Sequence, residues 1–390
     1  MKIESYVHSC LAIPELPFEV VEIKGRGHPD SICDLLCEQV SRDLLAFYQA
    51  ECGRPLHYNV DKALLVGGQS KPKFGGGEIL APAKLYLGDR ATSSVGDRKL
   101  PIDTVVRKAV AAWLEANVRF LRLGSSLEFI NEIRPGSASL SAVEDRHMSN
   151  DTSVGVGSWP PTPLERAVLD LEQHLNSQKF KAAHPETGED IKIMAARENE
   201  TVKIVCAIAM VDRFITSAAD YVEKKKVLAK DIQSYLAEKV PGQQFHVDVN
   251  TLDNLERGEA GLHLTVTGLS CEGGDSGQVG RGNRVNGTIS FLRPQTMEAW
   301  AGKNPITHVG KIYSFAAEAL AKRLCEAMPE ILQADVFLLG QIGKPVGEPA
   351  RIFCNLISHK ISPALHAEAN RFLREEVERG QVFQVAGAHE

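Results

Sequence analysis

The sequence predicts an α+β fold, and three observations lead to that class. Segments with helical periodicity alternate with short apolar strands along the whole chain of 390 residues. The clearest pair of strands reads as a hairpin, whereas a doubly wound parallel sheet needs a helix between successive strands. No Pro- or Ser-rich linker and no low-complexity tract divides the chain. At roughly 150 residues per domain, the length corresponds to about two or three domains.

The helices follow from the period of their apolar residues. In residues 30–50, Ile32, Leu36, Val40 and Leu44 recur at helical spacing, which predicts a helix. The same criterion predicts further helices over 101–120, 162–178 and 312–328. Each of these segments is long enough to cover one face of a small sheet.

The strands are shorter and adjoin glycines or turn residues. Strands are expected over 57–68, 78–87 and 262–267. The hairpin consists of 191–196 and 201–211. Apolar side chains alternate along its second arm, at Val202, Ile204, Cys206, Ile208 and Met210. Hairpins and helical crossovers in one chain favour a mixed α+β architecture.

The composition excludes several classes of protein. With a net charge of −6, a pI of about 6.1 and only 6% aromatic residues, the chain is not expected to bind nucleic acid. No window of about 18 apolar residues predicts a membrane span. The first residues carry Glu4, Pro14 and Pro17, which a secretory signal would not. The eight Cys include no CxxC motif, and Cys33 and Cys37 are interpreted as thiols in a reducing cytoplasm.

The strongest chemical signal is the Gly-rich stretch 268–287, which directly follows a predicted strand. Its glycines surround Asp275, Arg281 and Arg284. Glycine lets backbone N–H groups approach phosphate oxygens, while arginine and a metal-binding carboxylate neutralise the charge. The stretch matches neither a P-loop nor a dinucleotide fingerprint. A flexible surface loop is the alternative interpretation. A second Gly-rich turn, 75–77, is also expected to bring backbone close to phosphate.

Four further segments carry candidate groups. Residues 25–34 place His28 and Asp30 where a helix begins, and Asp30 would either cap that helix or bind a hard cation. Residues 301–311 place Lys303, His308 and Lys311 on a turn that leads into a helix. Asp151 lies among small residues, and Lys192 lies at the start of the hairpin, where a lysine can also protect a sheet edge. Together these acids and cations predict a site for a polyphosphate with Mg²⁺.

A series of motifs resembles one family, the archaeal-type S-adenosylmethionine synthetases. The motifs occur in the order of that family from about residue 20 to 350: GHPDSICD (27–34), NVDKALLVGG (59–68), FGGGEIL (74–80), NDTSVGVG (150–157), GEDIKIM (188–194), VGRGNRVNG (279–287) and AGKNPITHVGKIY (301–313). The resemblance implies that the sulfur of L-methionine attacks C5′ of ATP and that the released triphosphate is hydrolysed to pyrophosphate and phosphate. Ser276 and Gly273 depart from the family pattern, which has a second acid and a methionine there.

The resemblance also implies roles for individual residues. The groups at the triphosphate and the breaking bond are His28, Lys192, Arg281 and Lys303. The Mg²⁺ ligands are Asp30 and Asp275, and K⁺ is a second candidate cation. The other substrate-binding positions are Asp151, Asp190, Gly136, Ser137, Gly274, Gly277, His308 and Lys311.

For the architecture, the resemblance implies three similar βα modules about a pseudo-threefold axis. The modules would cover roughly residues 1–135, 136–260 and 261–390 and form one catalytic unit. We expect a homodimer whose sheets pack face to face, with active sites between the subunits, and alternating strands such as 201–211 are expected to supply these faces. Two alternatives remain open: an adenosyltransferase for a methionine analogue, and a catalytically silent ATP-binding regulatory homologue.

Overall fold

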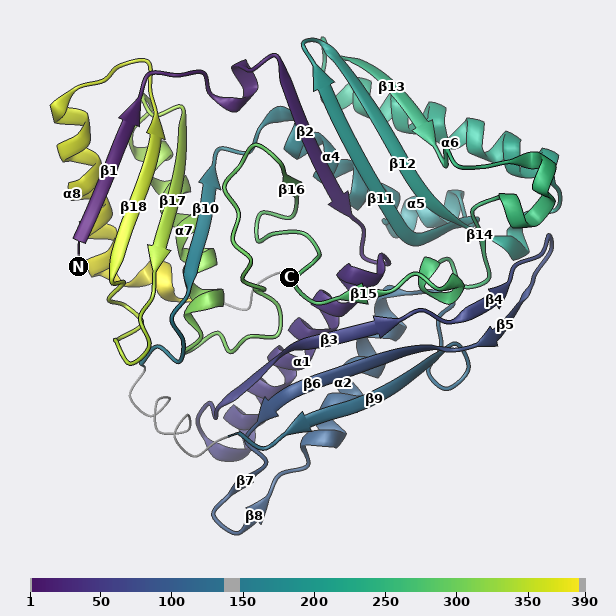
Figure 1. Ribbon diagram of the computed structural model, residues 1–390, viewed down its shortest axis with the longest axis horizontal. Coiled ribbons are helices and arrows are strands. Elements are labelled where there is room, and N and C mark those ends of the chain that lie inside the picture. Colours follow the sequence, from purple (N-terminus) through teal and green to yellow (C-terminus); the bar gives the residue numbers. More distant parts are fainter. Residues whose placement is uncertain (1, 137–147, 386–390) are drawn as a thin grey trace.

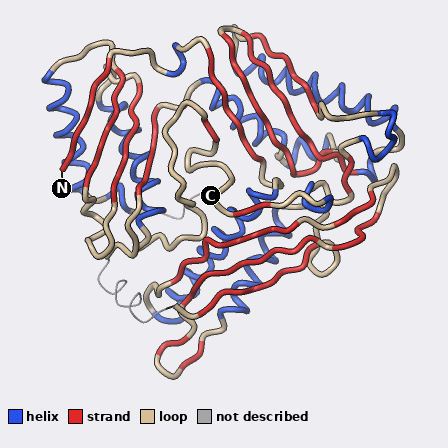
Figure 2. The backbone as a smooth tube through the Cα atoms, in the orientation of Figure 1, coloured by secondary structure: helices blue, strands red, loops and turns tan. Residues whose placement is uncertain are grey.

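The computed structural model describes residues 2–136 and 148–385, and in this part of the chain the predicted α+β class is confirmed. Three mixed sheets are arranged around a centre of long loops, and helices cover one side of each sheet (Figure 1). Two short ribbons complete the strands: β4 (Gln69–Lys71) with β5 (Glu78–Ala81), and β7 (Ser94–Val95) with β8 (Arg98–Lys99). The tube in Figure 2 shows that long irregular segments fill the space between the sheets.

The first sheet, which we call the β3 sheet, is covered by the first two helices. Its strands in spatial order are β15 (Gly277–Gln278), β3 (Tyr58–Val66), β6 (Ala83–Ala91) and β9 (Leu127–Arg134). Helix α1 (Pro29–Cys52) packs on β3 and on α2 (Ile102–Asn117). Its bounds follow from local chemistry, since His28 caps the first turn, Pro29 occupies the first helical position and Gly53 ends the helix at a φ of 70°.

The second sheet, the β11 sheet, contains the predicted hairpin. Its strands in spatial order are β13 (Gln244–Val249), β12 (Thr201–Val211), β11 (Thr187–Glu198), β2 (Phe18–Lys24) and β16 (Ile289–Ser290), and β14 (Leu264–Thr265) pairs with β12. The covering helices are α4 (Pro163–Leu175), α5 (Gln178–Ala183) and α6 (Ala218–Lys239). Helix α4 starts at a capping box in which Thr162 and Glu165 bond each other's backbone N–H.

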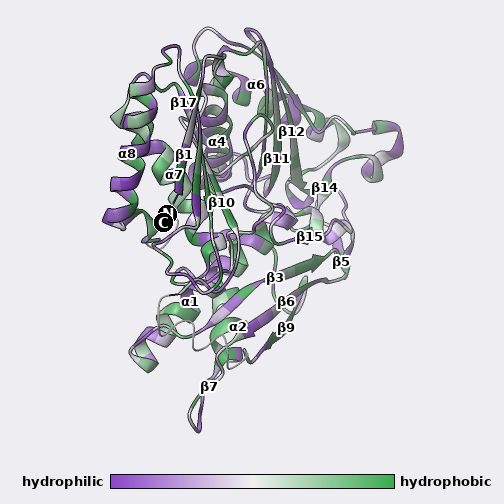
Figure 3. Cartoon of the chain, turned by 60° about the vertical axis from the view of Figure 1, so that its left-hand side comes forward, coloured by the Kyte–Doolittle hydropathy of each residue, from purple (hydrophilic) through white to green (hydrophobic). Residues whose placement is uncertain are grey.

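The third sheet, the β17 sheet, combines the N-terminal strand with strands from later in the chain. Its strands in spatial order are β1 (Lys2–His8), β18 (Arg351–Ile357), β17 (Gln333–Leu339) and β10 (Val154–Trp159). Helices α7 (Val309–Ala327) and α8 (Pro363–Arg379) cover it. Figure 3 shows α8 with hydrophobic and hydrophilic surfaces, and its buried residues Leu365, Ala369, Leu373 and Val377 recur every four residues.

The three sheets repeat one pairing pattern. Each has a central antiparallel pair, β3–β6, β11–β12 or β17–β18, with a parallel strand on one side and an antiparallel strand on the other. Each flanking antiparallel strand precedes a helix that packs on a different sheet. For example, β2 belongs to the β11 sheet and leads into α1, which covers the β3 sheet. The sheets are therefore joined by exchanged strands rather than by linkers.

Most predicted elements are present, with two differences. The helices expected over 30–50, 101–120 and 312–328 correspond to α1, α2 and α7, and the hairpin is β11–β12. The strand expected over 78–87 is interrupted at Pro82, which has no N–H for the ladder, and gives β5 and β6. The strand expected over 262–267 is reduced to the two residues of β14.

Each helix–sheet layer has its own hydrophobic core. The alternating residues of 201–211 belong to one of these cores: Val202, Ile204, Cys206, Ile208 and Met210 are buried together with side chains of α4 and α6 of the same chain. The prediction that these residues form a face for a partner subunit is therefore wrong. Their alternation reports packing against helices within the chain.

Candidate active site

The predicted site residues form two groups, and the first surrounds the start of α1. The backbone N–H of Gly25 donates to Ile191 O at 2.6 Å, and that of Gly27 donates to Glu189 O at 3.1 Å. A side chain at position 27 would collide with the backbone of Glu189 and Asp190. Glycine is needed here for this close approach, which brings β11 and its Lys192 beside His28.

His28 is held in one hydrogen-bonding role by the helix that it caps. Its Nδ1 accepts a hydrogen bond from the backbone N–H of Asp30 at 3.2 Å. Burial lowers the pKa of His28 to about 4, although the nearby Asp30 and Asp275 oppose this shift. At neutral pH the ring is therefore uncharged, and its proton lies on Nε2. His28 can thus donate a hydrogen bond from a fixed position.

Asp30 lies beside His28 and contacts a lysine that the sequence did not single out. Lys24 Nζ, at the end of β2, lies 2.9 Å from Asp30 Oδ2 and also donates to Arg281 O at 2.7 Å. Asp30 Oδ1 accepts the backbone N–H of Gln278 at 2.9 Å. Burial raises the pKa of Asp30, but the bonds from Lys24 and Gln278 outweigh it and hold that pKa below its ordinary value. Asp30 is therefore an ionised carboxylate that joins α1 to the Gly-rich stretch.

Asp190 and Asp275 bring further carboxylates to this group. Asp190 is buried and accepts hydrogen bonds from the backbone and the hydroxyl of Ser270, whose Oγ also lies 3.4 Å from Asp275 Oδ2. Burial raises the pKa of Asp190 to about 7, and the charges of Asp275 and Asp30 add to the shift. Lys192 is 41% exposed, and its Nζ lies 3.4 Å from Glu22 Oε1. We call His28, Asp30, Asp190, Lys192, Asp275 and Arg281, with Lys24, the His28 cluster.

The Gly-rich stretch is built differently from the phosphate cradle that the sequence predicts. The backbone N–H groups of Gly280 and Gly282 donate to Asp34, and that of Gln278 donates to Asp30. Gly277 lies so close to α1 that a side chain would collide with the backbone of Pro29. Gly274 has a φ of 95° at an exposed turn. Three of the amides therefore bind carboxylates of α1, and Arg281 projects from a fixed backbone.

The other Gly-rich turn also directs an amide to a carboxylate. Asp212, which is fully buried, accepts the backbone N–H of Gly77 at 2.7 Å and that of Lys73 at 3.2 Å. A backbone contact with phosphate was expected for residues 75–77. The backbone N–H of Gly77 instead donates to the carboxylate of Asp212.

The second group lies at the start of α7, and its cations are buried. Lys303 is 5% exposed and forms an ion pair with Asp61, and its Nζ lies 3.4 Å from Glu298 Oε2. Lys311 is 1% exposed and contacts both carboxylate oxygens of Glu38 at 2.9 and 2.6 Å. Each of these lysines is thus paired with a buried carboxylate, at the cost of desolvating both partners.

His308 repeats the arrangement of His28 at the other helix. It caps α7, and its Nδ1 accepts the backbone N–H of Gly310 at 3.2 Å. Burial lowers the pKa of His308 to about 3, so this ring is also uncharged. Its Nε2 lies 3.7 Å from Asp151 Oδ2. We call Lys303, His308, Lys311 and Asp151 the His308 cluster.

The remaining predicted positions are Gly136 and Ser137. Gly136 is half-buried beside His57, near the start of β3, whereas Ser137 lies outside the described residues.

Asn59, at the start of β3, pairs with Lys303, and Leu65, near its end, pairs with Gly277. Six residues of extended strand separate these points by about 20 Å. The structure thus brings the predicted residues together in two places instead of one.

Several residues of the clusters were missed by sequence reasoning. Lys24, Asp34, Glu38 and Asp61 bind predicted site residues or hold the Gly-rich stretch. Asp34 and Glu38 follow Asp30 at intervals of four on α1, so helical spacing could have indicated a common face. Asp61 pairs with Lys303, which is 242 positions away in the sequence, and no local sequence pattern predicts such a contact.

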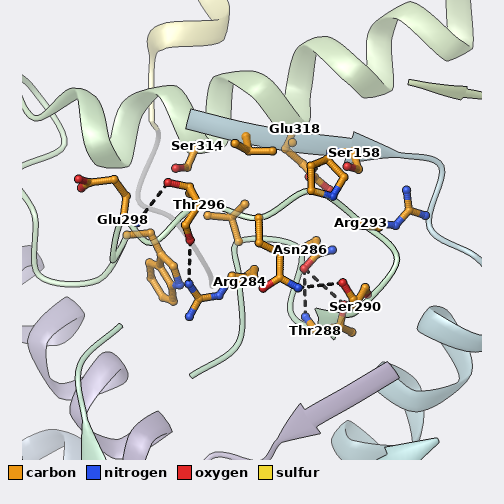
Figure 4. A pocket seen from close by; sticks show the side chains of 16 residues that line it. Ser158, Arg284, Asn286, Thr288, Ser290, Arg293, Thr296, Glu298, Ser314 and Glu318 are labelled. Carbon is orange, nitrogen blue, oxygen red and sulfur yellow. Dashed lines mark hydrogen bonds between the residues drawn. The ribbon is translucent and has the colours of Figure 1, made fainter. Parts of the chain in front are cut away.

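A separate pocket lies between β10, α7 and the segment 284–300 (Figure 4). It has a volume of about 40 Å³ and is lined by Ser158, Arg293 and Glu318 among other residues. Arg293 forms two hydrogen bonds with Glu165. Burial raises the pKa of Glu318 to about 7. Of the residues predicted for chemistry, only Arg284 lines this pocket.

The His28 cluster offers carboxylates for a divalent cation but not a complete set of ligands. Burial is the main cause of the raised pKa of Asp190, and the charges of Asp275 and Asp30 add to it, a repulsion that a cation would relieve. In residues 2–136 and 148–385, no group of three or more His, Cys, Asp or Glu side chains could hold a metal by itself. Mg²⁺ is commonly held by one or two carboxylates plus substrate phosphates and water. The residues present fit that mode.

A neutral donor beside lysines, an arginine and carboxylates suits an enzyme that handles a phosphorylated substrate, here on an α+β fold. A family model for S-adenosylmethionine synthetase (AdoMet synthetase) matches residues 2–385. The chain therefore belongs to the S-adenosylmethionine synthetase family, in its archaeal type, and is a methionine adenosyltransferase. Among the described helices, none is long and apolar enough to cross a membrane.

Individual relatives agree with the family assignment. The chain is 41% identical over 368 residues to the probable S-adenosylmethionine synthase of Aquifex aeolicus, covering 93% of this chain and 91% of that protein. It is 40% identical over 371 residues to the S-adenosylmethionine synthase of Pyrobaculum neutrophilum, with coverage of 93% and 92%. An unusual S-adenosylmethionine synthetase from Campylobacter jejuni has a similar fold, with a TM-score of 0.62 and 15% identity over 96% of this chain and 94% of that one.

Proposed function

We propose that the chain makes S-adenosylmethionine from ATP and L-methionine at a site to which the His28 cluster contributes. The observation that carries the proposal is the uncharged His28, which offers an Nε2–H donor among Lys24, Lys192 and Arg281. In the reaction, a bond forms between the methionine sulfur and C5′ of ATP. The bond from C5′ to the triphosphate oxygen breaks, and the triphosphate leaves with the electron pair. It is then hydrolysed to pyrophosphate and phosphate.

The demands of this reaction match the chemistry of the cluster. The sulfur attacks as a neutral nucleophile and needs no general base, so the protein has to align the attack and stabilise the leaving triphosphate. His28 would donate to the leaving oxygen, while Lys192 and Arg281 would neutralise the phosphates. Because the pKa of His28 is about 4, it would act as a hydrogen-bond donor and not as an acid that loses its proton.

Mg²⁺ would be held by Asp30 and Asp275 together with the phosphates of the substrate. Bound there, the ion would neutralise the charge that develops on the triphosphate. The buried Asp190 would hold Ser270 and so fix the turn that carries Asp275. A requirement for K⁺ is a separate proposal, which omission of K⁺ from the assay would test.

We infer that the repeated pairing pattern reflects three interwoven modules about a pseudo-threefold axis. Each sheet takes its central antiparallel pair from one of the segments 1–135, 136–260 and 261–390 and borrows flanking strands from the others, such as β15, β2 or β10. A cut between the segments would remove a strand from a neighbouring sheet. The three would therefore act as one folding unit.

We further propose a homodimer in which two chains complete each active site. In one chain, Gly277, which packs against Pro29 beside the His28 cluster, and Lys303 of the His308 cluster pair with β3 at points about 20 Å apart, too far for the two clusters to bind one triphosphate together. The β3 sheet exposes Leu64, Val66 and Tyr86 on the face away from its helices, and apolar residues of this kind favour packing against another surface. A second copy on that face would bring the His28 cluster of one chain to the His308 cluster of the other.

One assay separates the proposed function from its alternatives. The protein is incubated with ATP, Mg²⁺ and L-methionine, and S-adenosylmethionine and pyrophosphate are measured. Product with methionine is expected. Product only with a methionine analogue would favour the specialised adenosyltransferase, and ATP binding without product would favour the regulatory homologue.

Subunit complementation tests the shared site. His28→Ala and Asp151→Ala alter different clusters, and each variant alone is expected to have low activity. Random mixing of the two should give heterodimers with one intact site, and hence about a quarter of wild-type activity. No recovery after verified subunit exchange would mean that each chain carries a complete site.

A further inference from the structure

The backbone on both sides of Arg281 is held by a single side chain of α1, Asp34. Its Oδ1 accepts the N–H of Gly280 at 2.7 Å, and its Oδ2 accepts the N–H of Gly282 at 3.0 Å. The side chain is buried, with 4% of the residue exposed. Burying a carboxylate is costly unless hydrogen bonds satisfy it, and two backbone amides serve that purpose here.

Other contacts, from Lys24 at the end of β2, fix the same backbone. Arg281 O accepts a hydrogen bond from Lys24 Nζ at 2.7 Å. Asn283 exchanges two bonds of 2.9 Å with the backbone N–H and carbonyl of Lys24. The main chain is therefore held directly at three successive residues, 280 to 282, and the side chain of Asn283 anchors the next residue.

The side chain of Arg281 is exposed, in contrast to its immobilised backbone. It has no ion pair with another of the described residues, whereas Arg284, three positions later, donates to the carbonyls of Gly280, Gly282 and Thr296. An exposed guanidinium on a fixed backbone suits a group that binds a ligand, because less conformational entropy is lost on binding.

We propose that Asp34 is a positioning residue for Arg281 and sets the affinity of the site for the triphosphate chain. The proposal rests on the proposed function, because it assigns Arg281 to the phosphates. Asp34 itself does not contact the substrate: it acts by orienting the loop from which Arg281 projects.

The residue at position 282 supports this role independently. A Cβ at Gly282 would collide with Asp34 Oδ2. Only glycine allows the carboxylate to reach both amides. Glycine at position 282 is therefore explained by contact with α1, whereas Gly280 has a φ of 84°, which itself favours glycine.

A double-mutant cycle between Asp34 and Arg281 tests the proposal. Asp34→Asn keeps the shape but places an NH₂ group against one of the two amides, so one hydrogen bond is lost. We expect a loss of roughly tenfold in kcat/KM for ATP and in affinity for inorganic tripolyphosphate, which corresponds to about 1.4 kcal/mol. In an Arg281→Ala background, the same change should reduce either quantity by less than about twofold, because its effect passes through Arg281.

Two further variants keep the test decisive. Gly282→Ala should mimic Asp34→Asn with the carboxylate intact, and it replaces that variant in the cycle if Asp34→Asn does not fold. Asp43→Asn is the matched control, because Asp43 lies on the same helix and, among the described residues, its carboxylate bonds the side chain of Gln39; it should retain wild-type activity.

The outcomes distinguish this proposal from the proposed function. If the wild type makes S-adenosylmethionine but the cycle is additive, or if tripolyphosphate affinity is unchanged in Asp34→Asn and Gly282→Ala, Asp34 has only a structural role and the inference is overturned. If the wild type makes no S-adenosylmethionine, the proposed function fails, and tripolyphosphate binding still decides whether Asp34 acts through Arg281.

Discussion

The two helix starts that carry the clusters use the same cap in different surroundings. His28 at α1 and His308 at α7 each accept the N–H of the residue two positions on, and each stays uncharged because of burial. Around His28, the cationic groups Lys192 and Arg281 reach solvent. Around His308, each lysine is already paired with a buried carboxylate.

This difference favours the proposal that the His28 cluster binds the ligand, whereas the buried pairs of the His308 cluster mainly support the structure. Exposed cations retain their full charge for a ligand, whereas buried pairs mainly fix the geometry of the elements that they join. Substitutions of the exposed Lys192 and Arg281 should therefore lower turnover with little loss of stability. Substitutions at the buried lysines should lower stability first.

The largest effect is expected for Lys311→Met. This change leaves Glu38 buried without its partner and should lower the free energy of unfolding by about 3–5 kcal/mol. Denaturant titration of the variant measures the loss. The double variant Glu38→Gln/Lys311→Met removes both charges and should recover much of the stability. A variant with normal stability but weak ATP binding would show that Lys311 serves the substrate instead.

The next effect distinguishes the two histidines by their kinetics. His28→Ala should lower kcat by roughly 100-fold, or about 2.7 kcal/mol, because a donor to the leaving group is lost. The loss of the cap should cost only about 1 kcal/mol of stability. His308→Ala removes an equivalent cap and provides the control, with a smaller expected loss in kcat. Steady-state kinetics and thermal unfolding of both variants give the comparison.

The assignment of His28 to the breaking bond requires that His28→Ala lowers kcat more than His308→Ala does. A larger loss of kcat for His308→Ala would place the breaking bond at the second cluster. An unchanged kcat for His28→Ala, with only ATP affinity reduced, would contradict the role given to His28.

Local patterns in the sequence predicted the elements well, but not how the sheets exchange strands. The period of apolar residues gave α1, α2 and α7 within a few residues. By contrast, β15 and β16 have two residues each and pair with strands more than 200 positions away, so no period can reveal them. The alternation of 201–211 was read correctly as a strand, but it could not tell whether a helix or a second chain covers the face.

For the site, the motifs identified chemical groups but not their partners. His28, Asp30 and Lys192 do lie together, because Gly25 and Gly27 allow β11 to approach α1. The glycines at 277–282 were singled out as a phosphate cradle, whereas three amides of this stretch bind carboxylates of α1, which the loop sequence alone could not predict. The sequence of a loop specifies which hydrogen-bond donors and acceptors it carries, but the groups that they bond are set by the packing of the folded chain.

The smallest expected effect concerns a carboxylate on α7 that lacks the lysine partner found at Glu38. Glu318 accepts one backbone N–H, that of Ser158, at 3.3 Å, and burial raises its pKa from 4.5 to about 7. A carboxyl whose pKa is raised on folding costs no stability below about pH 4.5, where it is protonated in both states. The cost grows as the pH rises and is complete above about pH 7. Glu318→Gln keeps an acceptor for Ser158 and should stabilise the protein by about 1–3 kcal/mol at pH 8, with a smaller gain at pH 5. Thermal unfolding at both pH values measures this difference. An equal gain at the two pH values would mean that the charge of Glu318 is compensated in the fold, as that of Glu38 is.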